Sequence, residues 1–240
     1  MKLLEEMSWP EIEAGLRQTQ TIILPIGATE EHGPHLPIFT DTIQAIEVAR
    51  EAARKRDIFL APPVHYGICR STRGFPGTIT LEYDALRSFI HDILISFYES
   101  GFRRVLILTG HAGGQHLSAL KGACQQAVKE HDFRVSLVSL FDLIDSSMVE
   151  TPRDGHAGEI ETSLMMHIRK DLVKGKSEKH FPNRPRFLVL NDVRYLMGSG
   201  VMGDPSKASP EKGREFFEMA VKGVLEALEE IESYERPANN

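Results

Sequence analysis

The sequence predicts a three-layer α/β/α fold with a mostly parallel central sheet, formed by one domain of residues 1–240. Three observations support this fold class. Short apolar runs alternate with longer stretches of helical periodicity, clusters of polar residues follow the apolar runs, and no internal repeat or low-complexity linker divides the chain. Strands that alternate with helices form right-handed βαβ units, which bury a parallel sheet between two helical layers.

Four runs rich in apolar and β-branched residues are the predicted strands: Thr21–Ile26, Ile58–Ala61, Val105–Leu108 and Phe133–Leu140. Runs of this length without strict alternation are typical of strands that are buried on both faces. Pro62 and Pro63 follow the second run directly, where the lack of backbone N–H groups ends a strand.

Five further stretches are predicted helices: Asp41–Arg56, Leu81–Ser100, Gln115–His131, Glu159–Ile168 and Pro210–Ser233. In the first of them, Ile43, Ile46 and Ala49 are spaced to share one apolar face. Gly101 stands in the usual position for ending a helix. The remaining stretch, Asp171–Asp204, is rich in proline, glycine and charge, and it is predicted to be an irregular surface excursion, an oligomer contact or part of a lid.

The composition argues against several classes of function. A net charge of -6 and a pI of about 5.9 give no basic surface for nucleic acid. No apolar run approaches the roughly 18 residues that a membrane span needs. The N-terminal segment is rich in glutamate and does not resemble a signal peptide. The two cysteines, Cys69 and Cys124, are therefore expected to be reduced, and the protein is expected in the cytoplasm.

The densest group of chemically active residues lies between the first predicted strand and the next helix. Glu30, His32 and Asp41 belong to it, with Glu31 and His35 beside them. Mixed carboxylate and imidazole ligands suit Zn, Mn or Fe(II). A solvated acidic loop in which Asp41 only favours the helix N-terminus fits the same residues, so both interpretations stay open.

Two more polar groups lie further along the chain. His111 lies in the turn Gly110–Gly114, whose small residues let the backbone approach a ligand closely. His156, Glu159 and Glu161 precede or begin the fourth helix, where acidic residues are also favoured by the helix dipole. A packed or capping role is the ordinary alternative for each of these residues. The clusters Glu30–Asp41, Cys69–Thr78 and His111–His116 each follow a predicted strand, and because the carboxyl ends of parallel strands line a common crevice, we expect these three clusters to converge.

Five segments of the chain together resemble the creatininase (creatinine amidohydrolase) family, and they occur in the family's order. They are EEHGPHLPIFTD at Glu30–Asp41, FPGT at Phe75–Thr78, GHAGG at Gly110–Gly114, HAGEIETS at His156–Ser163 and GVMGDP at Gly200–Pro205. The resemblance implies a creatininase-like fold, a metal-dependent amidohydrolase and a homo-oligomer, a hexamer in family members.

The resemblance also implies roles for single residues. Two divalent metal ions, Zn, Mn or Fe, are expected to be bound by Glu30, His32, Asp41, His111 and Glu161, with Asp41 bridging. His156 is expected to donate a proton to the leaving nitrogen, assisted by Glu159 or Glu161. Cys69, Arg70 and Ala112 are expected to contact a small-molecule substrate.

Several positions depart from the family pattern. Creatininase has a metal-binding glutamate two residues after its motif histidine, and that position is Gly113 here; we predict that Glu161, rather than Glu159, replaces the missing ligand. Many members carry a serine and a histidine at the positions of Cys69 and Thr72. The tryptophans that enclose creatinine are also missing, since the only tryptophan is Trp9.

The favoured function is therefore hydrolysis of a small non-peptide C–N bond, in a cyclic amide, an amidine or a formamide, other than that of creatinine. Arg70 and Arg73 would suit an anionic substrate, because guanidinium groups bind carboxylate and phosphate well. Two alternatives remain: a metallopeptidase that trims a short peptide, and a non-catalytic metal- or nucleotide-binding protein.

Overall fold

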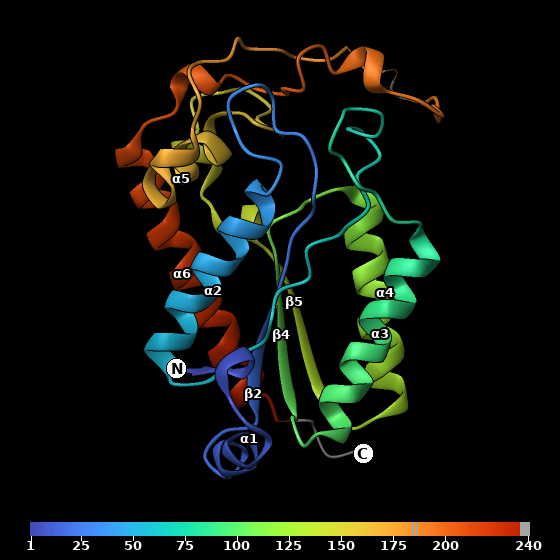
Figure 1. Ribbon diagram of the computed structural model, residues 1–240, viewed down its shortest axis with the longest axis vertical. Helices are drawn as coiled ribbons and strands as arrows, with labels where there is room; N and C mark the ends of the chain where they lie inside the picture. The colour runs from blue at the N-terminus through green and yellow to red at the C-terminus, as the bar shows by residue number, and fades with distance from the viewer. Residues whose placement is uncertain (184, 186, 236–240) are drawn as a thin grey trace.

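The computed structural model describes residues 1–183, 185 and 187–235. Within these residues the sheet has five strands, all parallel, in the order β1–β3–β2–β4–β5. The strands are β1 (Lys2–Leu3), β2 (Thr21–Ile26), β3 (Phe59–Leu60), β4 (Arg104–Thr109) and β5 (Arg134–Ser139). Helices flank this sheet on both sides (Figure 1), so the predicted three-layer fold is confirmed. The single domain over residues 1–240 stays a prediction.

The longer helices form the two outer layers. They are α1 (Trp9–Leu16), α2 (Thr40–Arg56), α3 (Tyr83–Glu99), α4 (Gly114–Glu130), α5 (Glu159–Ile168) and α6 (Pro210–Ser233). Helices α3 and α4 lie over one face of the sheet, whereas α2, α5 and α6 lie over the other (Figure 1). Short 3-10 segments occur at Leu4–Glu6, Leu140–Leu143, Ser146–Met148, Lys170–Leu172, Arg194–Leu196 and Pro205–Lys207.

Alternate residues of the central strands supply two hydrophobic cores. In β2, Ile22 and Leu24 point into the core under α3 and α4, whereas Ile23 points into the core under α2 and α6. In β4, Ile107 likewise points into the core under α3 and α4, and Leu108 points into the core under α2 and α6. Successive side chains of a strand project to opposite faces. Covering both faces therefore buries every residue of β2, which explains its continuous apolar sequence.

The ends of every predicted strand and helix agree with the structure to within two residues, whereas strand β1 and helix α1 were not predicted. Strand β1 has only two residues, too few to show any period. Helix α1 begins with a capping box between Ser8 and Glu11, a local signal that was available in the sequence. Helix α1 and the nearby β1 precede the first strand that was predicted.

The stretch Asp171–Asp204 contains little regular structure, as its composition predicts, although residues 184 and 186 lie outside the described part. It crosses above the ends of the strands at the top of Figure 1. Phe187, Leu188 and Val189 are at least two thirds exposed on this stretch. Among the described residues, no helix has both the length and the apolar character needed to cross a membrane.

Candidate metal centre and active site

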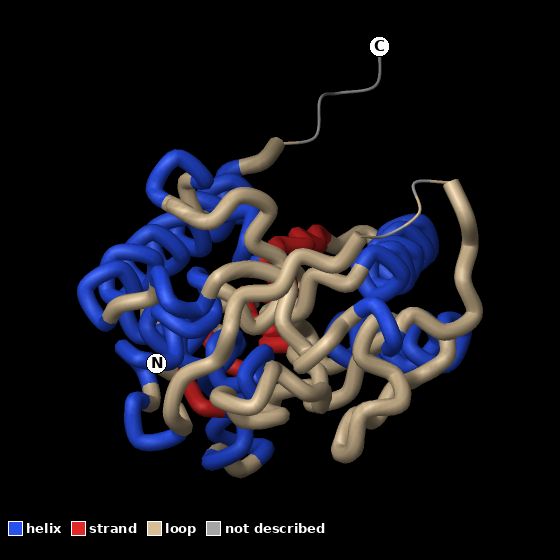
Figure 2. The backbone as a smooth tube through the Cα atoms, turned by 90° about the horizontal axis from the view of Figure 1, so that it is seen from above, coloured by secondary structure: helices blue, strands red, loops and turns tan. Residues whose placement is uncertain are grey.

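The carboxyl ends of β2 and β4 bring the predicted site residues together. The two strands pair in register up to Ile26 and Thr109, so the segments that follow them start side by side. Glu30 and His32 lie on the segment after β2, and His111 lies on the segment after β4. Viewed from above, loops cross over the strand ends with helices to either side (Figure 2). This is the expected place for a ligand crevice in a parallel sheet.

Gly110 permits the close approach of β4 to the start of α2. Its N–H donates to the Ile26 carbonyl over 2.9 Å, and a Cβ at this position would lie 2.1 Å from the backbone oxygen of Asp41. Any side chain at position 110 would therefore displace the first turn of α2. The glycine thus allows Asp41, the second residue of that helix, to lie beside His111.

Asp41 contacts two imidazole rings, one through each carboxylate oxygen. Its Oδ1 lies 2.9 Å from His32 Nε2, and its Oδ2 lies 3.1 Å from His111 Nδ1. Glu30 Oε1 is 2.8 Å from the same nitrogen of His111. On the other side, Glu161 Oε1 is 3.6 Å from His32 Nε2. Asp41 is therefore common to two clusters, one with Glu30 and His111 and one with His32 and Glu161.

Backbone carbonyl groups orient all three histidines of the site. His32 Nδ1 lies 3.0 Å from the Glu30 carbonyl, His111 Nε2 3.0 Å from the Ile68 carbonyl, and His156 Nε2 2.7 Å from the Glu31 carbonyl. A carbonyl oxygen only accepts, so each of these nitrogens donates a proton. In a neutral imidazole the other nitrogen then carries a lone pair, which here faces carboxylate oxygens. Metal-binding histidines typically donate their second N–H in this way.

The residues of the two clusters fit divalent metal ions. Glu30 Oε1 and Asp41 Oδ2 are buried without a hydrogen-bond partner. One ligand atom from each of His32, Asp41 and Glu161 lies within 4.8 Å of the others, and the same holds for Glu30, Cys69 and His111. A buried polar atom without a partner is costly. A cation that accepts lone pairs from both residue types would satisfy these atoms, and carboxylate with imidazole suits Zn, Mn or Fe.

Electrostatics also favour positive charge at this place. Burial opposes the ionisation of Glu30 and Asp41, yet the neighbouring imidazoles hold the pKa of both carboxyl groups below their usual values. Burial likewise opposes protonation of His32 and His111, but the carboxylates beside them raise the pKa of each ring well above its usual value. The carboxylates are therefore charged at neutral pH and attract cations.

A sequence profile of the creatininase family, described as creatinine amidohydrolase, matches residues 5–228 of this chain. The chain belongs to the creatininase family. It is therefore a hydrolase of that family.

Curated relatives of the chain carry three different names. A mycofactocin precursor peptide peptidase of Mycolicibacterium smegmatis is 31% identical, over 86% of this chain and 83% of the relative. A creatinine amidohydrolase of Pseudomonas putida is 27% identical, over 94% and 95%. A 3-dehydro-scyllo-inosose hydrolase of Thermotoga maritima is 32% identical, over 95% and 81%. Membership of the family thus does not identify the substrate.

Solved structures of creatininase share the fold over nearly the whole chain. One creatinine amidohydrolase structure has a TM-score of 0.87 at 25% identity and covers 99% of this chain and 98% of its own. A manganese form has a TM-score of 0.87 at 25% identity, and a Zn-Zn type variant has 0.86 at 26% identity. Each of these two covers 95% of this chain and 98% of its own.

A cavity of about 350 Å³ opens onto the clusters. Glu30, His111, His156 and Glu161 line it, together with Cys69, Arg70, Thr72, Ala112, Gly113, Phe141 and Met202. The three residues expected to contact substrate are therefore at the cavity. The charge of Arg70 is already paired, because its Nη2 lies 2.5 Å from Glu82 Oε2 and its Nε donates to Gln115 over 2.9 Å. Arg73 is exposed and also faces Glu82, at 3.7 Å, and a substrate contact of Arg70 stays a prediction.

The two glutamates at the start of α5 point in different directions. Glu161 faces His32 and belongs to the cluster of His32 and Asp41, and its replacement of the ligand missing at position 113 stays a prediction. Glu159 is fully buried away from the cavity: it accepts the N–H groups of Glu150 and Thr151 and pairs with Lys212 at 2.6 Å. The structure therefore does not bring Glu159 to His156.

His156 lies at the cavity beside the first cluster. Its Nδ1 is 4.0 Å from Glu30 Oε1, and its ring centroid is 4.4 Å from that of His32. Burial and the nearby His32 oppose its protonation, but Glu30, Glu31 and Glu161 raise the pKa of the ring above its usual value. A protonated imidazole that faces the cavity is suited to giving up a proton there.

Other residues near the clusters have supporting positions. Thr72 donates its hydroxyl to Glu30 Oε2, a contact that the sequence analysis did not identify because the partners are 42 positions apart. His35 contacts Thr162 rather than a residue of either cluster, and burial lowers its pKa to about 4, so it is neutral at neutral pH. Trp9 is 77% exposed on α1, at the opposite end of the molecule from these loops (Figure 1).

Proposed function

We propose that this chain hydrolyses a C–N bond in a small non-peptide substrate, either a cyclic amide or amidine or a formamide, at a site for two divalent ions. The observation that carries the proposal is the orientation of His32 and His111. Each ring donates one N–H to a backbone carbonyl and turns its other nitrogen toward a different oxygen of Asp41. When bound, the ions would generate a nucleophile from water near neutral pH and polarise the bond that is attacked.

The metal-binding and proton-donor roles are assigned to different residues of the chain. Glu30 and His111 hold one side of the site, His32 and Glu161 hold the other, and Asp41 joins them. His156 is the proposed proton donor, because its Nε2 donates to the Glu31 carbonyl, its Nδ1 lies 4.0 Å from Glu30 Oε1, and the residue lines the cavity. A positioned proton donor contributes roughly 10²–10⁴-fold to a rate. Glu159 has no part in this step, because its carboxylate is bound to Lys212 and two backbone N–H groups.

A second candidate function, the trimming of a short peptide, is favoured by one specific observation. A neighbouring cavity of about 490 Å³ shares Ala112, Phe141, Gly155, His156 and Glu161 with the first. It extends the site along an apolar wall, which an elongated substrate could occupy. The 31% identity to a mycofactocin precursor peptide peptidase supports the same reading. Creatinine itself is not favoured, since the one tryptophan of the chain lies far from the cavity.

Metal analysis tests the proposal directly. Purified protein loaded with Zn²⁺ or Mn²⁺ and freed of excess ion is expected to retain about two ions per chain, as a two-metal site requires. The loaded protein is then assayed on cyclic amides, formamides and short peptides. Fewer than one ion per chain would refute the metal-dependent function. Full loading without hydrolysis of any of these would favour a non-catalytic protein, and cleavage of peptides alone would favour the second candidate.

We also propose that the chain forms a homo-oligomer, a hexamer by family resemblance. Phe187 and Val189 are 84% and 100% exposed in the irregular stretch Asp171–Asp204, and such apolar exposure is typical of a contact surface. Light scattering at micromolar concentration is expected to give a mass several times that of the 26.9 kDa chain. A monomer under these conditions would contradict the proposal.

A further inference from the structure

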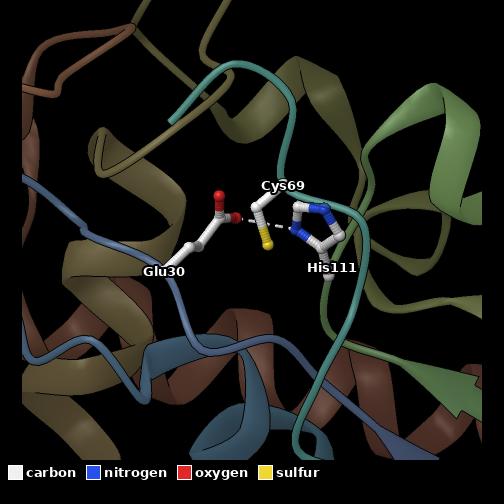
Figure 3. Close-up of side chains that lie close together, drawn as sticks. All are labelled: Glu30, Cys69 and His111. Carbon is white, nitrogen blue, oxygen red and sulfur yellow. Dashed lines mark ion pairs between the residues drawn. The ribbon is translucent and has the colours of Figure 1, made fainter. Parts of the chain in front are cut away.

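Cys69 lies against the cluster of Glu30 and His111. Its side chain is 1% exposed and lines the cavity of about 350 Å³. One ligand atom from each of the three residues lies within 4.8 Å of the others. Figure 3 shows the sulfur of Cys69 directed into the space where the Glu30 carboxylate and the His111 ring face each other. Geometry therefore offers three ligand atoms of different chemistry around one small space.

A second observation in the same space points to a ligand. Glu30 Oε1 has no hydrogen-bond partner, although Glu30 is only 2% exposed. It lies 2.8 Å from His111 Nδ1, while Nε2 of the same ring donates to the Ile68 carbonyl. A buried carboxylate oxygen and an imidazole nitrogen at this distance must share a cation, either a proton on the nitrogen or a metal ion that takes its place.

The backbone holds Cys69 in this place. The Cys69 N–H donates to Thr80 Oγ1 over 2.9 Å, and the preceding Ile68 carbonyl accepts from the His111 ring. These two hydrogen bonds hold the backbone of Ile68 and Cys69 against the His111 ring. A Cβ on Gly113 would lie 2.6 Å from His111 Nε2, so a side chain there would displace this ring. Glycine contributes no ligand atom at position 113, whereas the Cys69 sulfur lies within 4.8 Å of a ligand atom of Glu30 and of His111.

We propose that Cys69 is a thiolate ligand of the ion held by Glu30, Asp41 and His111, an inference that rests on the proposed two-metal function. On binding, the thiol S–H bond breaks, its proton passes to water, and a sulfur lone pair forms the bond to the ion. The ion held by His32 and Glu161 has no sulfur ligand. Because soft thiolate ligands select Zn²⁺ and harder oxygen ligands suit Mn²⁺, the first position is zinc-selective and the second is not.

X-ray absorption at the zinc edge tests this assignment on the full-length, zinc-loaded protein. A Zn–S distance of about 2.3 Å is expected beside Zn–N and Zn–O distances of about 2.0–2.2 Å. The Zn–S contribution should disappear in Cys69→Ser and persist in Cys124→Ser. Cys124 is the matched control, because it is the other buried thiol and lies in the hydrophobic core on α4. Competition between zinc and manganese should shift toward manganese in Cys69→Ser only.

The outcomes separate the inference from the proposed function. Two bound zinc ions with nitrogen and oxygen neighbours alone, or a Zn–S distance that survives in Cys69→Ser, would overturn the cysteine ligand and leave the two-metal function standing. Failure to bind zinc at all would overturn both. If Cys69→Ser does not fold, Cys124→Ser still decides: the chain has two cysteines, so a Zn–S distance that persists there belongs to Cys69.

Discussion

Asp41→Asn is expected to lose bound metal and hydrolytic activity together. Both oxygens of Asp41 face imidazole nitrogens, at 2.9 and 3.1 Å, so the amide would replace one of them with an NH₂ group that cannot bind an ion. Asp41 would be the ligand shared by both ions, so without it the site would lose the charge that lowers the pKa of a bound water toward neutral pH. The metal content measured by elemental analysis should fall from about two ions per chain to fewer than one.

The fold should survive this change. Asp41 is the second residue of α2, whose N-cap is Phe39, so its carboxylate contributes about 0.3–1 kcal/mol through the helix dipole, and an asparagine keeps a side-chain oxygen that can still accept from one of the two imidazole rings. Chemical unfolding of the metal-free variant and the metal-free parent protein should therefore give similar midpoints. An Asp41→Asn variant with both ions and full activity would show that Asp41 serves the helix alone.

Glu161→Gln and Glu159→Gln are expected to separate metal binding from stability. Glu161 Oε1 is 3.6 Å from the nitrogen of His32 that faces Asp41, so its loss should remove the second ion and leave the first. Glu159 instead pairs with Lys212 at 2.6 Å and accepts two backbone N–H groups. Its replacement should retain both ions and lower the free energy of unfolding by about 1–3 kcal/mol, the cost of weakening buried polar contacts.

The two variants are matched in charge and size and lie two positions apart on one helix. Measuring both bound metal and urea unfolding for each variant therefore shows which glutamate binds the ion and which one stabilises the fold. If Glu159→Gln lost the second ion while Glu161→Gln kept both, the assignment of the two carboxylates would be reversed. Equal loss of metal in both would indicate a general disturbance of α5 rather than loss of a ligand.

Local sequence patterns determined most of the fold. The bounds of β2, α5 and α6 match the predicted Thr21–Ile26, Glu159–Ile168 and Pro210–Ser233 because apolar runs and helix-capping residues act within a few positions of themselves. Strand β1 could not be predicted in this way, since two residues are too few to show a period. Helix α1 could have been predicted, because its capping box is visible in the sequence.

The sequence by itself also determined which residues meet at the strand ends. Glu30, His32, Asp41 and His111 converge because parallel neighbouring strands end at one edge of the sheet. Helical spacing showed that Glu159 and Glu161 face different ways. It could not show which of them faces His32, because that depends on how α5 packs against α6 and Lys212.

Only the tertiary structure decided the orientations and pairings within the site. The carbonyl groups of Glu30 and Ile68 determine which nitrogen of His32 and His111 faces Asp41, and Ile68 is 43 positions from His111. The segment between β3 and α3 carries Ile68, Cys69 and Arg70. Its path therefore also determines the pairing of Arg70 with Glu82 and the position of Cys69 beside Glu30. These contacts join residues far apart in the chain, so their geometry is set by packing, which no local pattern of residues records.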